Sequence, residues 1–271
     1  MIWKQIGKRD KIQRWKNRIA PLFPTSDMFN VHIAIRENIQ YSNSRSPAAW
    51  VLNTTEYCAW HSSLKPTGLW IQGKVGTGKT VIMSTITERL LEDYHRNESH
   101  DRGLGYFYCN ARYNIDDILK SLIFQLADNQ KSLEVLIPLT ENPEQAHLSQ
   151  DRLKMFLRQI TMQENRESMI IIDGVDELRV DVFDFLVFLV QLASSSPGRV
   201  KIIISSRTGI RDIQRSLRKY WPILEVDENF TGEDIREYID TEVHRQARRK
   251  DISDELESDI KRIVASRSKG I

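Results

Sequence analysis

Residues 73–80 read Gly-Lys-Val-Gly-Thr-Gly-Lys-Thr, and this stretch decides how the rest of the chain is interpreted. It fits the pattern G-x-x-x-x-G-K-[ST], in which a loop wraps around phosphate groups with its backbone N–H groups pointing inward. Glycines permit that path and keep side chains out of the way. The apolar stretch 69–72 precedes the loop and helical periodicity over Lys79–Leu91 follows it. Phosphate binding requires this order, because the helix N-terminus faces the anion.

Two side chains of the loop have distinct expected roles. We expect the Lys79 ammonium group to lie beside the β- and γ-phosphates of a nucleotide, and the Thr80 hydroxyl group to bind Mg²⁺. The alternative, a glycine-rich turn with a solvated lysine, is disfavoured by the flanking strand and helix. The predicted nucleotide-binding residues are Gly73, Lys74, Val75, Gly76, Thr77, Gly78, Lys79, Thr80 and Val81.

A second signal is the apolar run Met169–Ile172, which is followed directly by Asp173. A buried strand of this kind delivers the carboxylate to its C-terminal end, the edge at which doubly wound sheets bind ligands. In P-loop NTPases, Mg²⁺ is held by the loop hydroxyl and an Asp of this type. We therefore predict that Thr80 and Asp173 are the metal ligands.

Asp176 and Glu177 follow the predicted metal ligand after two residues. An acid beside the metal can orient or deprotonate a water molecule for attack on the γ-phosphate. The alternative is that both acids only stabilise the N-terminus of the next helix through its dipole. We predict a catalytic role for this pair and slightly prefer Glu177 over Asp176.

A third polar strand end is Ser205-Ser206-Arg207, which follows the apolar residues 202–204. If this strand lies beside the strand before the loop, Arg207 can reach the γ-phosphate and report its presence. The alternative is a surface arginine. We include Arg207 among the catalytic candidates, and together with the acids at 176 and 177 it favours water activation over phosphate transfer to a second substrate.

Short apolar runs alternate with helical periodicity between Gly68 and Asp227, which predicts an α/β fold with a parallel sheet. The strands are apolar throughout and do not alternate with polar residues, as expected for a sheet covered on both faces. We expect strands at 69–72, 104–109, 169–172, 201–205 and 223–226, and helices at 79–91, 115–126 and 180–192.

The chain divides into three expected parts: a basic helical and linker segment (1–46), a P-loop NTPase core (47–228) and the truncated start of a small helical subdomain (229–271). Ile12, Trp15, Ile19 and Leu22 recur at helical spacing. They predict an amphipathic helix packed on the core, with contact to acidic partners or phosphates as the alternative. Residues 41–47 are expected to form a loop.

The C-terminal part is expected to be helical. Thr231, with Asp234 three residues later, is interpreted as a variant of the capping box that opens a helix. A second helical stripe is predicted from the apolar residues Ile252, Leu256, Ile260, Ile263 and Val264.

Charge and composition exclude several classes of protein. The net charge is +2, from 39 basic and 37 acidic side chains, which argues against a chain that mainly neutralises nucleic acid or coats an acidic membrane. The basic first twenty residues prompt a nucleic-acid-dependent ATPase as the least favoured alternative. The most apolar run, 185–190, is too short to span a bilayer. We expect a cytoplasmic protein in which Cys58 and Cys109 are reduced and mostly buried.

Taken together, these motifs resemble the NACHT branch of the signal-transduction ATPases (STAND class), and within it the fungal NACHT and nephrocystin-like proteins. The segments that carry the resemblance are Leu69–Gly73 before the loop, Asp173–Glu177 (D-G-x-D-E), Ser205–Arg207, Thr231–Ile235, and Trp50 with Trp60. The family commonly has Thr-Ser-Arg in its sensor strand, so Ser205 is a mild departure. The resemblance covers roughly Pro47 to Ile271.

The resemblance implies a five-stranded parallel core in which the Arg207 strand separates the loop strand from the Asp173 strand. It implies a switch that holds ADP, exchanges it for ATP or GTP with Mg²⁺, hydrolyses it slowly and forms a homo-oligomer when activated. Effector and repeat domains would lie outside this chain. No base-reading motif separates ATP/ADP from GTP/GDP. A non-hydrolysing nucleotide-binding interaction scaffold is the alternative function.

Overall fold

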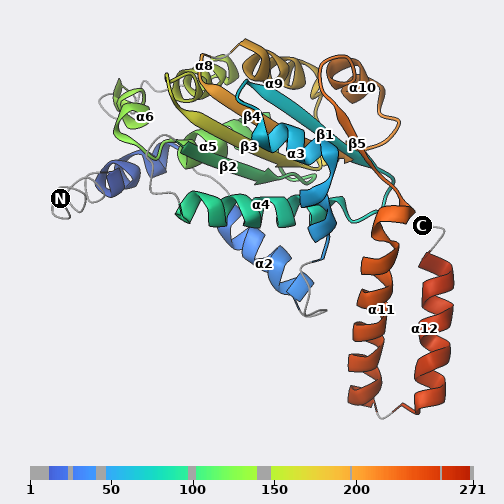
Figure 1. Ribbon diagram of the computed structural model, residues 1–271. Coiled ribbons are helices and arrows are strands. Elements are labelled where there is room, and N and C mark those ends of the chain that lie inside the picture. Colours follow the sequence, from blue (N-terminus) through green and yellow to red (C-terminus); the bar gives the residue numbers. More distant parts are fainter. Residues whose placement is uncertain are drawn as a thin grey trace.

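The computed structural model describes residues 12–23, 27–40, 47–96, 102–138, 148–195, 197–250 and 252–268. Its centre is a sheet of five parallel strands in the order β2-β3-β4-β1-β5 (Figure 1). The strands are β1 (Thr67–Gly73), β2 (Arg102–Tyr108), β3 (Glu167–Asp173), β4 (Arg199–Arg207) and β5 (Ile223–Val226). The order confirms that the strand ending in Arg207 separates the loop strand from the Asp173 strand.

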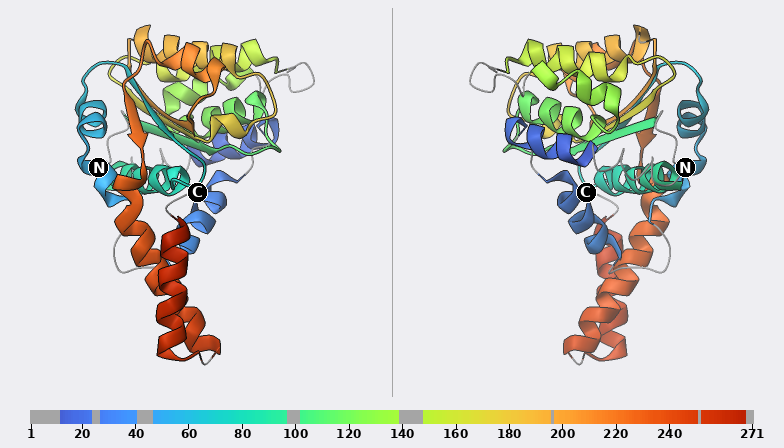
Figure 2. Two further views of the ribbon diagram at one scale, coloured as in Figure 1. Left: turned by 90° about the vertical axis from the view of Figure 1, so that its right-hand side faces the viewer. Right: turned by 90° about the vertical axis from the view of Figure 1, so that its left-hand side faces the viewer.

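Helices cover both faces of the sheet, and the direction of each crossover decides which face a helix takes. The chain moves one way along the sheet from β1 to β2 and the opposite way in every later step, so right-handed crossovers place α4 on one face and the later helices on the other. Figures 1 and 2 show α4 and α2 below the sheet and α8, α9 and α10 above it. The helices are α2 (Met28–Gln40), α3 (Thr55–Ser62), α4 (Lys79–Arg96), α5 (Ile115–Leu126), α6 (Gln130–Glu134), α8 (Gln150–Thr161), α9 (Phe183–Ser195), α10 (Arg211–Leu217), α11 (Glu228–Lys250) and α12 (Asp254–Ser268), with 3-10 turns η1 (Ala20–Leu22), η2 (Ala49–Asn53) and η4 (Val175–Glu177).

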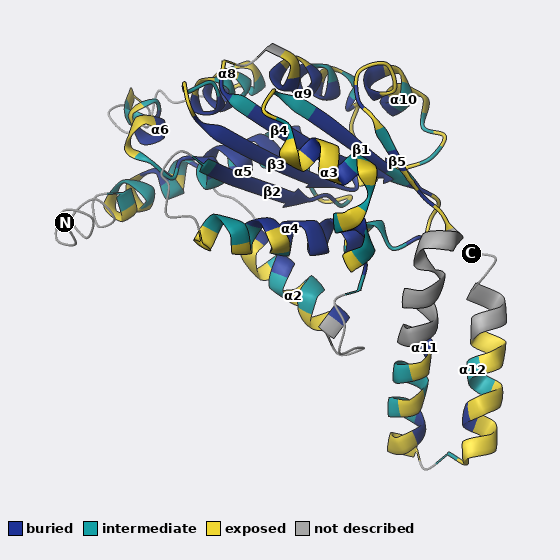
Figure 3. Cartoon of the chain, in the orientation of Figure 1, coloured by how far each residue is buried: buried dark blue, intermediate teal, exposed yellow. Residues whose placement is uncertain are grey.

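The sheet lies in the core of the molecule because its strands are apolar on both sides. Every residue of β3 is buried, and β4 is buried from Val200 to Ser206 (Figure 3). Helices from both layers contribute to the same continuous core cluster, among them α4 through Ile82 and Ile86 and α9 through Phe185. This double coverage confirms what the uninterrupted apolar runs predicted.

The predicted strands are all present, most of them slightly longer than expected. The helix predicted from Val180 begins only at Phe183. The Asp181 carboxylate accepts a hydrogen bond from the Phe183 backbone N–H at 2.8 Å, and this local cap holds the preceding residues out of the helix. Cys109 is buried as expected. Cys58 is exposed, because α3 buries a different face through Tyr57 and Trp60.

The described part of the N-terminal segment packs on the core, as its apolar spacing predicted. Residues 12–19 are helical. Ile19 is fully buried, and Ile12, Trp15 and Leu22 lie partly buried against the core cluster. Residues 1–11 and the predicted loop residues 41–46 lie outside the described residues.

The C-terminal helices form a hairpin that projects away from the sheet (Figures 1 and 2). Helix α11 begins at Glu228, directly after β5, and continues through Thr231. The interpretation of Thr231 as a helix cap is therefore wrong, because the helix is already under way at that residue. Helix α12 contains the predicted second stripe from Leu256 to Val264, but Ile252 precedes the helix. Leu256, Ile263 and Val264 are exposed. Within the described residues, none of the helices combines the length and apolar character that crossing a membrane requires.

Candidate nucleotide-binding site

The glycine-rich loop joins the end of β1 to the start of α4 at the carboxyl edge of the sheet. Gly73 pairs with Arg207 of β4 on one side and Val226 of β5 on the other. A Cβ atom at Gly73 would lie 2.6 Å from Thr77 Oγ1 and 2.8 Å from the Val226 carbonyl oxygen, so only glycine fits there. Gly76 and Gly78 have φ angles of 81° and 76°, which glycine adopts without strain.

The Lys79 side chain lies across the opening of its own loop. Its Nζ atom donates hydrogen bonds to the carbonyl oxygens of Gly73 at 2.8 Å and Lys74 at 2.6 Å. Partial burial lowers the pKa of Lys79, and the nearby carboxylates of Asp176 and Asp173 oppose that shift. A third, longer contact of 3.5 Å joins Lys79 Nζ to Thr77 Oγ1. All three acceptors are uncharged, so the ammonium group can gain stronger, charge-assisted bonds from phosphate oxygens. The loop and its lysine therefore fit a phosphate group.

The two predicted metal ligands are in direct contact. Thr80 Oγ1 donates a hydrogen bond to Asp173 Oδ2 at 2.8 Å, and Ser205 Oγ donates one to the other oxygen, Oδ1, at 2.5 Å. Burial raises the pKa of Asp173, while the hydrogen bonds from Ser205 and Thr80 act to lower it. A hydroxyl and a carboxylate oxygen are the hard donors that Mg²⁺ prefers. The donor set at this edge therefore fits Mg²⁺.

The described residues include no cluster of side chains that would hold a metal ion by itself. Within the described ranges, no group of three or more His, Cys, Asp or Glu side chains is arranged to hold a metal ion. A cation at Thr80 and Asp173 would thus complete its shell with phosphate oxygens and water, as Mg²⁺ commonly does in nucleotide sites.

The structure separates the two acids that follow β3. Asp176 Oδ1 accepts a hydrogen bond from the Arg207 backbone N–H at 3.1 Å, and Oδ2 lies 3.1 Å from Arg207 Nε. The Asp176 side chain is 3% exposed and that of Arg207 is 49% exposed. Glu177 is exposed, and among the described residues its carboxylate has no hydrogen-bond or ion-pair partner. Asp176 therefore anchors Arg207, whereas Glu177 is free to meet a ligand.

Sequence reasoning missed part of the site. Ser205 entered it only as a departure from the family pattern, yet it contacts Asp173 directly. Cys109, which follows β2, donates its backbone N–H to the Asp173 carbonyl oxygen at 2.9 Å, and burial raises the pKa of its thiol. The signal for Ser205 was present, because it is the first polar residue after a buried apolar strand, as Asp173 is.

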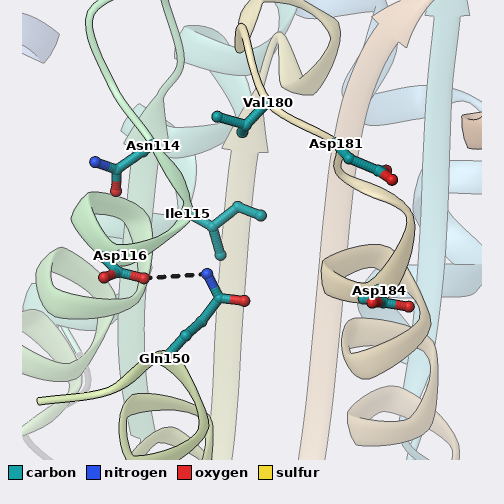
Figure 4. Close-up of a pocket in the computed structure, with 7 residues that line it drawn as sticks. All are labelled: Asn114, Ile115, Asp116, Gln150, Val180, Asp181 and Asp184. Atoms are coloured by element: carbon teal, nitrogen blue, oxygen red, sulfur yellow. Dashed lines mark hydrogen bonds between the residues drawn. The ribbon is translucent and has the colours of Figure 1, made fainter.

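A separate hollow of about 390 Å³ lies between the starts of α5, α8 and α9 (Figure 4). In it, Asp116 Oδ1 accepts a hydrogen bond from Gln150 Nε2 at 3.1 Å. None of its lining residues belongs to the glycine-rich loop, so it does not contribute to the phosphate-binding geometry. The lining residues are Asn114, Ile115, Asp116, Gln150, Val180, Asp181 and Asp184.

The sequence from residue 47 to residue 207 matches the family described as Nephrocystin 3, N-terminal. The chain belongs to this family. The matched range contains the glycine-rich loop, Asp173 and Arg207, and it covers more than half of the chain. The nephrocystin 3 N-terminal match ends at the last residue of β4, so β5 and the α11–α12 hairpin follow it.

A fungal relative also shares sequence with this chain. Over 172 residues, or 58% of the chain, it is 27% identical to the vegetative incompatibility protein HET-E-1 of Podospora anserina. The chain spans only 12% of that relative's length. The family match and this relative confirm the resemblance to fungal NACHT and nephrocystin-like proteins.

Comparison with solved structures found weaker similarities. One is CDC6P from Pyrobaculum aerophilum, with a TM-score of 0.46 and 16% identity, covering 73% of this chain and 51% of that one. Another is the Walker-type ATPase PABY2304 of Pyrococcus abyssi, with a TM-score of 0.44 and 13% identity, covering 83% of this chain and 66% of that one.

Proposed function

We propose that this protein binds ATP or GTP together with Mg²⁺, hydrolyses the nucleotide slowly, and couples its nucleotide state to self-association. One observation carries the proposal. Lys79, Thr80 and Asp173 converge at the carboxyl edge of the sheet, where Thr80 Oγ1 lies 2.8 Å from Asp173 Oδ2. Ligands of doubly wound sheets bind at this edge.

Each residue of the site has a defined task in the proposal. The loop N–H groups and the N-terminus of α4 bind the phosphates, and Lys79 exchanges the Gly73 and Lys74 carbonyl oxygens for phosphate oxygens. Thr80 and Asp173 hold Mg²⁺, which when bound neutralises charge on the phosphate oxygens.

Glu177 is the better candidate for the residue that orients or deprotonates the attacking water. Asp176 is nearly buried and occupied with Arg207, whereas the Glu177 carboxylate is exposed. A general base must be within reach of the proton that it takes. Both acids were predicted as catalytic, and the geometry supports that role for Glu177 and an anchoring role for Asp176.

Arg207 supports the switch part of the proposal, because a phosphate group could replace the carboxylate with which it pairs. In the structure its guanidinium group pairs with Asp176 through Nε at 3.1 Å. A γ-phosphate at the loop would compete for the same guanidinium group, since arginine binds phosphate as readily as carboxylate. Movement of Arg207 between these partners would report whether a triphosphate or a diphosphate is bound.

The same proposal includes self-association and effector and repeat domains outside this chain. It also includes the division of the chain into residues 1–46, 47–228 and 229–271. These parts of the proposal are supported by the family membership and by the hairpin that follows β5. A homo-oligomer formed with a non-hydrolysable triphosphate and absent with the diphosphate would support the coupling. Light scattering after size exclusion measures the mass directly.

The alternative is a scaffold that binds nucleotide without hydrolysing it. Phosphate release from ATP and from GTP, measured for the wild type, Lys79→Ala and Glu177→Gln, separates the two functions. We expect release by the wild type well below the roughly 10 s⁻¹ of a median enzyme, and none above background in either variant. Wild-type release no higher than that of Lys79→Ala would exclude hydrolysis at this site and leave the scaffold.

A further inference from the structure

The hydroxyl group of Ser205 is fully buried at the end of β4 and contacts two parts of the neighbouring strand end. Its Oγ donates to Asp173 Oδ1 at 2.5 Å and accepts from the Gly174 backbone N–H at 2.8 Å. A serine hydroxyl has a single proton to donate. The hydroxyl proton is donated to the carboxylate, and a lone pair of the oxygen accepts from the backbone N–H. These two bonds fix the orientation of the hydroxyl group.

The contact with Asp173 determines how the carboxylate is turned. With Oδ1 bound to Ser205, the other oxygen, Oδ2, is directed at Thr80 Oγ1. Rotation of an aspartate about χ2 is otherwise soft. Because Mg²⁺ demands near-ideal octahedral geometry, a carboxylate held in one orientation binds it better than one that rotates.

The contact with Gly174 links the same hydroxyl to the turn that carries the acids. Gly174 has a φ angle of 67° and precedes the η4 turn with Asp176 and Glu177. Ser205 therefore holds the metal-binding carboxylate and the start of this turn in a single relative position.

We propose that Ser205 is a positioning residue for the Mg²⁺ site: through its hydroxyl group it orients Asp173 toward Thr80 and ties that carboxylate to the Gly174 turn. The inference rests on the proposed function, since it concerns the metal that accompanies the nucleotide. Hydrogen-bonded partners behind metal ligands typically change metal affinity by about 10- to 100-fold when removed.

Ser206 provides a matched control one residue along the same strand. It is also fully buried, but successive strand side chains point to opposite faces. Its Oγ accepts from Trp70 Nε1 at 2.9 Å and donates to the Arg207 carbonyl oxygen at 3.0 Å. Ser206→Ala therefore removes the same atom at the same burial without touching Asp173.

The test measures the affinity for a fluorescent ATP analogue with Mg²⁺ and with EDTA, for the wild type, Ser205→Ala, Ser205→Thr and Ser206→Ala. We expect Ser205→Ala to reduce the Mg²⁺-dependent gain in affinity by about 10-fold or more and to leave the affinity in EDTA within about 2-fold of the wild type. Ser205→Thr keeps the hydroxyl group and should show the full Mg²⁺-dependent gain in affinity. Ser206→Ala should show the full gain as well.

Several outcomes would overturn the inference. They are an unchanged Mg²⁺ gain in Ser205→Ala, an equal loss with and without Mg²⁺, an equal loss in Ser206→Ala, and no gain in the wild type. If Ser205→Ala does not fold, Ser205→Cys keeps the shape with a weaker donor and carries the same expectation. Failure of the proposed function is separately visible, because the wild type and Lys79→Ala would then bind the analogue equally.

Discussion

The two acids of the η4 turn differ in their surroundings, and this difference predicts different kinetics for their variants. Glu177→Gln should lower the rate of single-turnover hydrolysis by about 100-fold or more, because a general base contributes 10²–10⁴-fold, while nucleotide affinity stays within about 3-fold. Rapid-quench measurement of phosphate formation at saturating nucleotide tests this. Asp176→Asn serves as the comparison, and a larger loss in that variant than in Glu177→Gln would reverse the two roles.

Sequence patterns named the candidate residues of the site but not the contacts between them. Lys79, Thr80 and Asp173 came from motif and strand context, because each role depends on a residue type at a fixed local position. The contacts of Ser205 with Asp173 and of Arg207 with Asp176 depend on which strands are neighbours and in what register. The residue pattern within each strand does not indicate its register with the neighbouring strands, so these contacts could not be predicted.

At the level of single elements, the start of the loop tolerates only glycine. A Cβ atom at Gly73 would overlap Thr77 Oγ1 and the Val226 carbonyl oxygen. We expect Gly73→Ala to destabilise the domain by about 1–3 kcal/mol, as overpacking does, and to weaken nucleotide binding. Urea unfolding and nucleotide titration measure the two effects.

Gly209→Ala is the control for this substitution. Gly209 follows the end of β4 as Gly73 ends β1, but a Cβ atom at Gly209 has no neighbour within 4 Å and only its φ angle of 84° is strained. Gly209→Ala should lower the free energy of unfolding by about 1–2 kcal/mol and leave nucleotide binding unchanged. Equal nucleotide affinity in both variants would show that the close packing at Gly73 does not shape the loop.

Helix α2 is attached through a buried histidine, which predicts a pH dependence of stability. His32 Nδ1 lies 2.7 Å from the Tyr108 hydroxyl oxygen and Nε2 lies 2.9 Å from a Glu88 carboxylate oxygen. Burial lowers the pKa of His32, and the hydrogen bond to Glu88 opposes the shift. Between the native pKa and the unfolded value of about 6.5, the native state then binds fewer protons than the unfolded state.

The contribution of His32 to stability is therefore complete above pH 6.5 and is lost as the pH falls through its native pKa. Wild-type protein should lose more unfolding free energy between pH 7.5 and pH 5 than His32→Gln does. Urea unfolding of both proteins across that range measures the two slopes. A steeper slope in His32→Gln than in the wild type would contradict the expected sign.

Among the elements, the strands and the long α4 were predicted because their apolar runs and periodicity are unambiguous. Helix α8 was missed although Leu153, Phe156, Leu157 and Ile160 are buried on one of its faces at helical spacing. The start of α11 was misplaced because Thr231 has the chemistry of a cap, whereas the chain after β5 is already helical at Glu228. The capping chemistry of Thr231 therefore does not mark the start of this helix.

For the whole molecule, the main core ends with β5. Among the described residues, the core cluster runs from Ile19 to Val226 and includes no residue of α11 or α12. We therefore expect a chain that ends at Asp227 to unfold cooperatively, with a midpoint within a few degrees of that of residues 1–271. Calorimetry measures the midpoint, and the loss of a cooperative transition would show that the hairpin is part of the folding unit.

The central claim is that the loop at 73–80 binds the phosphates of a nucleotide, and calorimetric titration with ATP and with GTP in the presence of Mg²⁺ tests it most directly. Wild-type protein should bind at least one of them, and Lys79→Ala should bind about 10- to 150-fold more weakly, which corresponds to the 1.5–3 kcal/mol of a charge-assisted hydrogen bond. Equal affinity of the two proteins for both nucleotides would contradict the account.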